Sequence, residues 1–337
     1  MEYKEEKAFG RLCKPLCDNG HISALSCEPM HKGKFAVFTA LWNDTPVVIK
    51  SHRIKSEYIP LQWATSNLTE VFPNYQEMVE MVTQSLLINY GVQQKNVMDV
   101  LYPFLGDYQI SSVERELMIN LWQLSQDNEY VTLMINQNSS LFPKILGSCG
   151  TFYAVEYAKP ISKLDIYSND LNGFRSRAEQ AKLLLELLHE LQKSFPDPMY
   201  MCDVKLEHFG LLNGRQVLLD ADTVFPKLVV DRSVADGREC WEHSDCDLFD
   251  CRSLCNKVLR VCDTPAVNNN LQIVCQKIFL DSGLLRSRHL PSRIEKLLNE
   301  CANPFHSQGR QAAPIQIYYE LVSFLNEFLS FMIQSEN

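Results

Sequence analysis

The pattern of apolar and polar side chains predicts strands early in the chain and helices through most of the rest. Residues 33–53 form two runs rich in β-branched and aromatic side chains that meet at Asn43-Asp44, which is typical of a β-hairpin. Residues 142–160 predict a second pair of short strands. Apolar side chains recur at helical spacing over residues 60–100 and 111–137.

The second half of the chain begins with a strong helical pattern. Residues 175–195 are amphipathic and end before Pro196, which favours one long helix. Residues 200–225 then form two hydrophobic, strand-like runs around an Asn-Gly turn, with Asp203 in the first run and Asp220 at the end of the second. Helical patterns dominate from there to the end.

This order of elements predicts an α+β protein of two lobes, a small β-rich lobe followed by a larger helical one. We expect a cysteine-rich, irregular segment at residues 1–30 and a first lobe with a helical insertion at 31–158. We expect a second lobe at 159–337, with a cysteine-rich insertion at 240–262. The sequence shows neither internal repeats nor low-complexity tracts.

Cysteine is the residue that changes this picture most. The chain holds 12 cysteines in clusters, three of them at Cys13, Cys17 and Cys27 and five within residues 240–262. An even number in spaced clusters favours disulfides and a secretory compartment. Zinc is the alternative, but only two pairs have a ligand-like gap, both C-x-x-x-C. The residues alone leave both readings open.

Three glycosylation sequons, beginning at Asn43, Asn67 and Asn138, agree with a secretory protein. Pro46 follows the first sequon and weakens it. The opening residues contain no apolar run of the kind that signal peptides carry. Either a signal or membrane anchor lies in a segment absent from this chain, or the cysteines are reduced. We expect the absent segment, which would be the only route to a membrane. The net charge of −9 argues against nucleic acid as a partner.

Buried charge is the feature that points to chemistry, because a carboxylate in apolar surroundings needs a cation, a metal or a catalytic task. Lys50 ends one apolar strand, and Asp203 and Asp220 lie 17 residues apart, with Lys205 two residues after the first. Phosphoryl transfer from a nucleotide uses this inventory: a lysine on the phosphates, one aspartate for the acceptor hydroxyl and one for Mg²⁺.

In these motifs the chain resembles protein kinases. The run "VVIK" resembles their third-strand lysine motif, "MCDVKLEH" their catalytic loop and "LLDAD" their metal-binding triad. More closely, it resembles the divergent protein kinase domain family, cysteine-rich proteins of the secretory pathway. That closer likeness rests on "LCKPLC", "LWQLSQDNEY", "FPKILGSCGTFYAVEY" and "CWEHSDCDLFDCRSLC", and it extends over most of residues 10–301.

The resemblance implies a role for each matching position, with ATP and Mg²⁺ or Mn²⁺ as cofactors. Lys50 would hold the nucleotide phosphates and pair with Glu129, or failing that with Glu116. Asp203 would be the catalytic aspartate, and Lys205 would steady the transferred phosphate. Asp220 would be the main metal ligand. A hinge beside the nucleotide would fall at Glu156-Tyr157.

The sequence also departs from the kinase pattern. Gly33 is the one glycine where a glycine-rich loop should lie, and His208 replaces the asparagine that binds a second metal. Asp222 stands where the triad has glycine, and this extra carboxylate would supply the ligand that a histidine supplies poorly to Mg²⁺. The stretch "FLGDYQISSVE" lacks the acids of a calcium loop, and no A-P-E-like motif follows the triad.

Two functions remain open at this point. The first is an atypical kinase of the endoplasmic reticulum or Golgi lumen, membrane-anchored or secreted, that phosphorylates a protein or glycan acceptor. The second is an inactive pseudokinase that serves as a lumenal or secreted binding module. We interpret Asp245, Asp247 and Asp250, which lie between the late cysteines, as a solvated acidic face.

Overall fold

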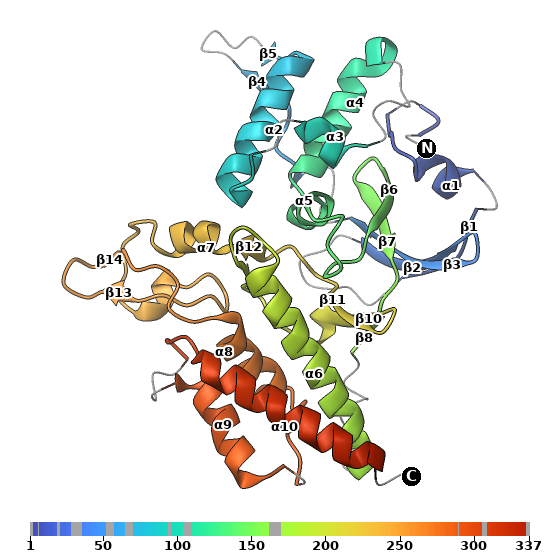
Figure 1. Cartoon of the computed structure of the whole chain (residues 1–337). Coiled ribbons are helices and arrows are strands. Elements are labelled where there is room, and N and C mark those ends of the chain that lie inside the picture. The colour runs from blue at the N-terminus through green and yellow to red at the C-terminus, as the bar shows by residue number, and fades with distance from the viewer. Residues whose placement is uncertain are drawn as a thin grey trace. The chain divides into compact units, whose positions relative to one another are not determined.

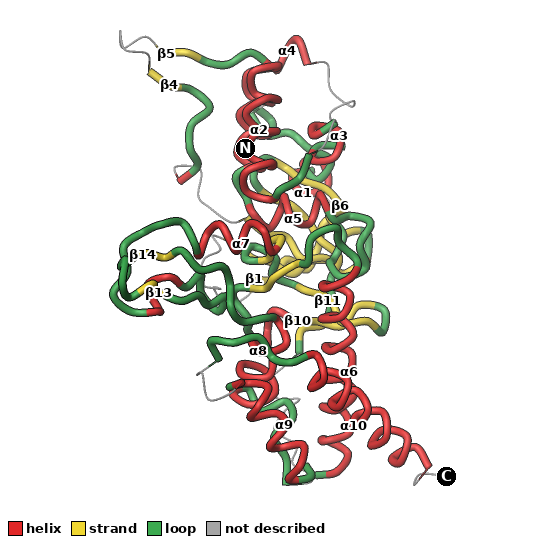
Figure 2. The backbone as a smooth tube through the Cα atoms, turned by 60° about the vertical axis from the view of Figure 1, so that its left-hand side comes forward, coloured by secondary structure: helices red, strands yellow, loops and turns green. Residues whose placement is uncertain are grey.

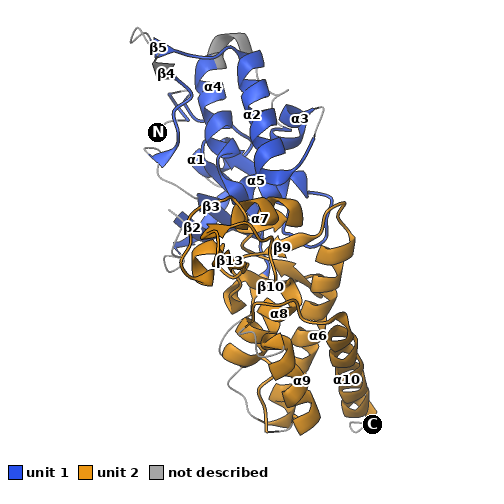
Figure 3. Cartoon of the chain, turned by 90° about the vertical axis from the view of Figure 1, so that its left-hand side faces the viewer, with its two compact units in different colours: residues 1–158 blue, residues 159–337 orange. Residues whose placement is uncertain are grey.

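The computed structural model describes most of the chain, in two compact units that comprise residues 1–158 and 159–337 (Figure 3). The described residues are 3–5, 7–18, 21–27, 36–51, 57–64, 70–93, 96–103, 110–161, 170–288, 290–304 and 309–334. Gly33, Asn67 and much of the calcium-loop-like stretch lie outside them. Among the described helices, none is both long and apolar enough to cross a bilayer.

The first unit is built on a five-stranded antiparallel sheet in the order β1-β2-β3-β7-β6 (Figure 1). Its strands are β1 (Ile22–Cys27), β2 (Ala36–Trp42), β3 (Thr45–Ser51), β6 (Ile145–Cys149) and β7 (Phe152–Glu156). The short strands β4 (Trp63–Ala64) and β5 (Glu70–Val71) pair separately. Asn43 and Asp44 both adopt positive φ, +48° and +63°, as a two-residue hairpin turn requires, so the predicted hairpin is confirmed.

Five helices accompany this sheet in the described residues of the first unit (Figure 2). They are α1 (Cys13–Cys17), α2 (Tyr75–Tyr90), α3 (Val97–Leu101), α4 (Ile110–Ser125) and α5 (Asn128–Ile135). The helical pattern over residues 111–137 is therefore interrupted, because the Asp127 side chain accepts a hydrogen bond from the Tyr130 amide and starts α5 anew.

The expectation of an irregular segment at residues 1–30 is wrong. β1 adds an edge strand to the sheet, and α1 is fixed by a disulfide between Cys13 and Cys149. An edge strand with five exposed residues and a bulge shows no apolar alternation, so the pattern gave no sign of it.

The second unit contains three small sheets and a group of helices. Its strands are β8 (Lys159–Pro160), β9 (Met199–Met201), β10 (Phe209–Leu212), β11 (Arg215–Leu218), β12 (Val224–Pro226), β13 (Cys255–Asn256) and β14 (Val261–Cys262). Its α-helices are α6 (Leu171–Lys193), α7 (Lys227–Val234), α8 (Asn270–Val274), α9 (Ser292–Ala302) and α10 (Ile315–Gln334). The π-helix η6 (Cys275–Asp281) continues α8, and η4 (Leu206–His208) and η5 (His243–Cys246) are 3₁₀ turns.

The helix α6 is the core of this unit. Nine of its side chains are buried, and α10 lies along it, with Phe174 and Phe328 in edge contact at 5.0 Å between ring centres (Figure 1). The turn between β10 and β11 has positive φ at Asn213 and Gly214, as the Asn-Gly pair predicts. Asp203, however, lies in the loop after β9 and not within a strand.

Ten of the twelve cysteines form disulfides: Cys13–Cys149, Cys202–Cys251, Cys240–Cys255, Cys246–Cys262 and Cys275–Cys301. The prediction of a disulfide-rich, mixed helix-and-sheet chain with a small N-terminal sheet is thereby confirmed. Residues 237–264, here called the cysteine-rich module, contain the paired strands β13 and β14 and a buried cluster of four cysteines.

Candidate functional site

The candidate residues form two groups, one in each unit. In the first unit, β3 carries Lys50 and the first turn of α5 carries Glu129. The Lys50 Nζ lies 2.5 Å from the Glu129 Oε1, and the side chains are 10% and 0% exposed. Tyr153 lies opposite Lys50 on β7, and its hydroxyl donates to the other Glu129 oxygen at 3.1 Å. The carboxylate is therefore held at both oxygens.

The local sequence explains this placement. Val47 and Ile49 are buried at 1% exposure and fix β3 in the sheet, so Lys50 follows them at a defined register. The Asp127 cap starts α5 two residues before Glu129. A carboxylate in the first turn of a helix also gains from the helix dipole. The buried pair is thus produced by a strand and a helix cap together, since neither fixes it alone.

The residues at the expected hinge have different surroundings. The Glu156 carboxylate accepts a hydrogen bond from the Lys144 amide at 2.9 Å, which closes the pairing of β6 with β7. Tyr157 follows with 39% of its surface exposed. Their role beside a nucleotide stays a prediction.

In the second unit, the loop after β9 and the end of β11 bring four of the candidate residues into contact. The Lys205 Nζ donates to the Asp203 carboxylate at 2.6 Å. Partial burial lowers the pKa of Lys205, but the hydrogen bond and charge of Asp203, with the charge of Asp220, raise it above the ordinary value overall. Lys205 is therefore a cation at neutral pH, as contact with a phosphate requires.

His208 connects the two aspartates. Its Nδ1 lies 3.1 Å from the backbone carbonyl of Asp203, and its Nε2 lies 3.5 Å from the Asp220 Oδ2. A carbonyl only accepts hydrogen bonds, so Nδ1 carries a proton. In a neutral ring, Nε2 is then an acceptor that faces a carboxylate oxygen, also an acceptor. A second proton on the ring, a bridging water or a cation between the two groups would relieve this contact.

The remaining metal candidate, Asp222, is half-buried two residues after Asp220. Across the described ranges, the only three side chains whose metal-ligating atoms all lie within 4.8 Å of one another are those of Cys240, Cys246 and Cys255. Their sulfurs are joined in disulfides with cysteines of the same module. Asp220 with His208 thus forms a two-ligand arrangement, which suits a divalent cation that keeps several waters.

The pattern of the sequence missed one residue at this site. Asp250, interpreted above as part of a solvated face, is only 9% exposed, and its carboxylate accepts from the Val204 amide beside Asp203 at 2.8 Å. Asp247 also differs, since it is half-buried and paired with Arg310. Each contact joins residues at least 46 positions apart, so neither leaves a local pattern. Asp245, which is exposed, agrees with the interpretation.

Comparison with known proteins adds the family. A family model described as "Protein-kinase domain of FAM69" matches residues 121–304. A second, "N-term cysteine-rich ER, FAM69", matches residues 1–102. This match and the five disulfides indicate the secretory pathway.

Curated relatives agree with the family models. Human "Divergent protein kinase domain 2A" is 28% identical over 207 residues, which cover 55% of this chain and 46% of that protein. The mouse protein of the same name is 30% identical over 195 residues, or 51% and 44% of the two chains. The matched region is thus less than half of each relative.

A solved structure entitled "PpkA-294 apo form" aligns with a TM-score of 0.36 and 9% identity, over 90% of this chain and 96% of that one. The two family models, taken together, match both the N-terminal cysteine-rich region and the kinase-like region of one group of proteins. The chain belongs to the FAM69 family of divergent protein-kinase-like proteins.

Proposed function

We propose that this protein binds ATP with a divalent cation and transfers phosphate to a hydroxyl group. Lys50 would contact the nucleotide phosphates, and Asp220 with His208 would hold the cation. Asp203 would orient the acceptor hydroxyl, and Lys205 would steady the transferred phosphate. The cation would neutralise the charge that develops on the phosphate oxygens. The single observation that carries the proposal is the contact between His208 and Asp220.

That contact favours a cation because of its chemistry. With the proton of His208 on Nδ1, a lone pair on Nε2 faces the Asp220 carboxylate at 3.5 Å. One nitrogen and one carboxylate oxygen match Mn²⁺ better than Mg²⁺, which prefers oxygen ligands alone. Asp222 adds a carboxylate in the same loop. We therefore expect nucleotide binding to be stronger with Mn²⁺ than with Mg²⁺.

The same contact supports a second candidate function. A doubly protonated His208 would form an ion pair with Asp220 and take the place of the cation. The protein would then be a pseudokinase, a lumenal or secreted module that binds a partner without transferring phosphate. The two candidates differ in one measurable property, the dependence of nucleotide binding on a metal.

The test is a thermal unfolding series with ATP, in Mn²⁺ and separately in Mg²⁺. Ligand at 100 times its Kd stabilises the folded state by about 2.7 kcal/mol, which raises the Tm by several degrees. We expect this increase for the wild type with Mn²⁺, and its loss in Asp220→Ala. Glu207→Gln is the matched control, because Glu207 is an exposed acid in the same loop.

A third variant, His208→Phe, separates the two candidates further. If His208 is a metal ligand, the phenylalanine variant loses the Mn²⁺-dependent increase in Tm. If nucleotide raises the Tm of the wild type equally with and without a metal, or not at all under either metal, the phosphotransferase proposal is wrong and the pseudokinase candidate is favoured.

The acceptor and compartment follow from the family and from the chemistry. An acidic, disulfide-rich protein suits the lumen of the endoplasmic reticulum or Golgi, or secretion from it. Its acceptor would be a hydroxyl of a protein or a glycan, both of which are present there. We propose no nucleic-acid partner, and membrane attachment only through a segment outside this chain.

We further propose that Asn138 carries an N-linked glycan. Asn138 and Ser140 are exposed in the turn that follows α5, as an N-linked glycan requires. Asn43 contrasts with it, because its side chain contacts the His21 ring at 3.3 Å inside a two-residue hairpin turn that Pro46 follows.

The test is glycosidase treatment of the secreted protein in ¹⁸O-water, which converts a glycosylated asparagine into a labelled aspartate. We expect the label at residue 138 and the loss of one glycan in Ser140→Ala. Thr45→Ala is the control, and its glycan content should equal that of the wild type. An unlabelled residue 138 would contradict the proposal.

A further inference from the structure

The loop that carries Asp203 is attached to the cysteine-rich module on both sides of that residue. The Cys202 sulfur is bonded to Cys251, with 4.9 Å between the Cα atoms. The Asp250 amide donates to the Cys202 carbonyl at 2.7 Å, and the Asp250 carboxylate accepts from the Val204 amide at 2.8 Å. Two adjacent residues of the module therefore hold the residue before Asp203 and the residue after it.

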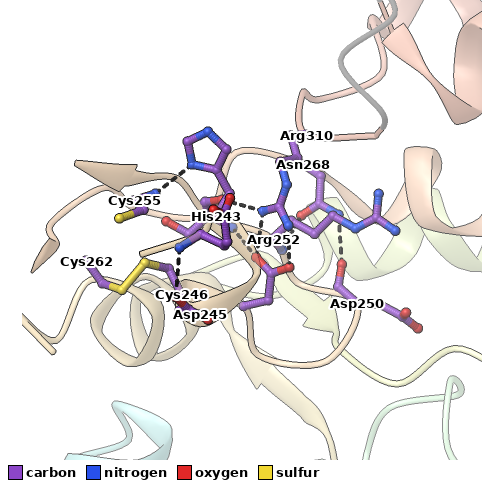
Figure 4. A network of polar contacts seen from close by, with 12 residues as sticks. His243, Asp245, Cys246, Asp250, Arg252, Cys255, Cys262, Asn268 and Arg310 are labelled. Atoms are coloured by element: carbon purple, nitrogen blue, oxygen red, sulfur yellow. Dashed lines mark hydrogen bonds and ion pairs between the residues drawn. A yellow bond between two sulfur atoms is a disulfide. The ribbon is translucent and has the colours of Figure 1, made fainter. Parts of the chain in front are cut away.

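Asp250 is itself fixed from its far side. Its second carboxylate oxygen lies 2.9 Å from the Lys277 Nζ in the π-helix η6. Its carbonyl accepts from the Asn268 side chain at 2.8 Å (Figure 4). A carboxylate that is only 9% exposed needs such partners, because burial without them is costly. The contacts thus join the Asp203 loop, the module and η6 into one chain of bonds.

The arrangement leaves the Asp203 side chain accessible while its backbone is held. The Asp203 side chain is 28% exposed and contacts Lys205, whereas Cys202 is fully buried and Val204 is 2% exposed. An aspartate that orients an acceptor must stay within fractions of an ångström of one position, because a shift of about 1 Å costs roughly 100-fold in rate.

We propose that Asp250 and the Cys202–Cys251 disulfide act as a clamp that positions Asp203 for phosphate transfer. This inference rests on the proposed function. In the kinase pattern an activation segment follows the metal-binding triad, and here the cysteine-rich module occupies that part of the sequence. The module therefore has a direct task at the site, in place of the solvated face that its acids suggested.

The module does not depend on the clamp for its own structure. Cys240–Cys255 and Cys246–Cys262 close it internally. Arg310 is paired with Asp247 through two nitrogens, at 2.8 and 2.7 Å. Removal of the clamp should therefore loosen the Asp203 loop and leave the module folded, which makes the positioning role separable from folding.

Two independent variants remove the clamp, Asp250→Asn and the double variant Cys202→Ser/Cys251→Ser. The asparagine keeps the shape of the side chain but loses its charge toward Lys277. The double variant removes the disulfide without leaving an unpaired thiol. Asp247→Asn is the matched control, since it breaks an ion pair of the same module that does not contact the Asp203 loop.

The first measurement is hydrogen–deuterium exchange of residues 199–208, which needs neither substrate nor activity. We expect exchange at Val204 to become at least about tenfold faster in both clamp variants, because Asp250→Asn replaces a charged acceptor with a neutral one and the double variant frees the neighbouring residues Cys202 and Cys251 from each other. In Asp247→Asn we expect the exchange rate of the Val204 amide to equal that of the wild type. Unchanged exchange in both clamp variants would overturn the clamp.

The second measurement is steady-state ATP hydrolysis with Mn²⁺, in which water replaces the unknown acceptor. We expect kcat to fall at least about tenfold in the clamp variants, with KM for ATP within about twofold of the wild type. A loosened loop with an unchanged kcat would refute the positioning role. If the wild type neither binds nor hydrolyses ATP, the proposed function fails, and the exchange data still decide whether the clamp exists.

Discussion

At the scale of single residues, the ion pair between Lys50 and Glu129 is the most deeply buried ion pair described in the candidate site. Both side chains are buried, and the carboxylate also accepts from Tyr153. Loss of one partner of a buried pair leaves an uncompensated charge and typically costs about 3–5 kcal/mol, whereas loss of both costs much less.

We therefore predict strong coupling between Lys50 and Glu129 in a double-mutant cycle. Lys50→Met and Glu129→Leu should each lower the free energy of unfolding by about 3 kcal/mol, and the double variant should be less destabilised than the sum. Lys205 and Asp203 provide a comparison, since Lys205 is half exposed and coupling at such surface pairs is about 0–1 kcal/mol. Urea unfolding measures both cycles. If the coupling energy between Lys50 and Glu129 is as small as that between Lys205 and Asp203, water screens the Lys50–Glu129 pair and the prediction is wrong.

At the scale of elements, the N-terminal segment is attached to β6 along its backbone. The Leu12 amide donates to the Ser148 carbonyl and the Gly150 amide donates to the Phe9 carbonyl, each at 3.0 Å. Gly10 adopts φ +134° at this contact, and a Cβ added there would lie 1.9 Å from the Ser148 carbonyl oxygen. The segment and the strand thus approach too closely for any side chain at position 10.

We predict that Gly10→Ala destabilises the first unit by more than about 2 kcal/mol, because the backbone must separate and the adjacent hydrogen bonds weaken. Gly91→Ala is the matched control. Gly91 also has positive φ, at +66°, but no atom lies within 4 Å of an added Cβ, so only the conformational cost of about 1 kcal/mol remains. Thermal unfolding of the two variants measures the difference, and equal losses would contradict the close approach.

The sequence predicts those elements whose determinants are local. The hairpin at Asn43-Asp44 and the turn at Asn213-Gly214 depend on residues that tolerate positive φ, and both are found where the pattern places them. The start of α5 depends on the Asp127 cap. The sequence contains this residue, but the apolar spacing on either side of it is equally that of one continuous helix. The apolar pattern did not predict β1, because this edge strand is exposed, contains a bulge and buries no side chains at alternating positions.

Of the candidate site, the local pattern supplies charged residues, and the family resemblance supplies one contact, the pairing of Lys50 with Glu129, which the structure confirms. Lys50 and Glu129 are 79 positions apart, and only the fold brings them together. No local pattern predicts that Asp250 is buried. Its burial depends on contacts with Val204 and Lys277 and on the disulfide formed by its neighbour Cys251. Long-range partners decide whether an acidic residue is solvated or buried, and no spacing along the chain encodes them.

At the scale of the whole molecule, the disulfides divide into local and distant ones. Cys240–Cys255 and Cys246–Cys262 join residues 15 and 16 positions apart, so the cysteine-rich module closes from within. Cys13–Cys149 joins residues 136 positions apart and fixes α1 to the end of β6. The Cys13–Cys149 bond can therefore form only after nearly the whole of the first unit has been synthesised.

That long span sets an order of events during synthesis. At roughly 5–20 residues per second, Cys149 is added roughly 7–27 s after Cys13. Until then residues 1–148 offer Cys13 two other thiols, Cys17 and Cys27, and a bond to either one is not the bond found in the structure. The native bond thus requires that Cys13 stays reduced or that an early wrong pairing is exchanged. By either route, Cys13 must be available as a thiol when Cys149 is added, so the first unit matures only after β6 has been synthesised.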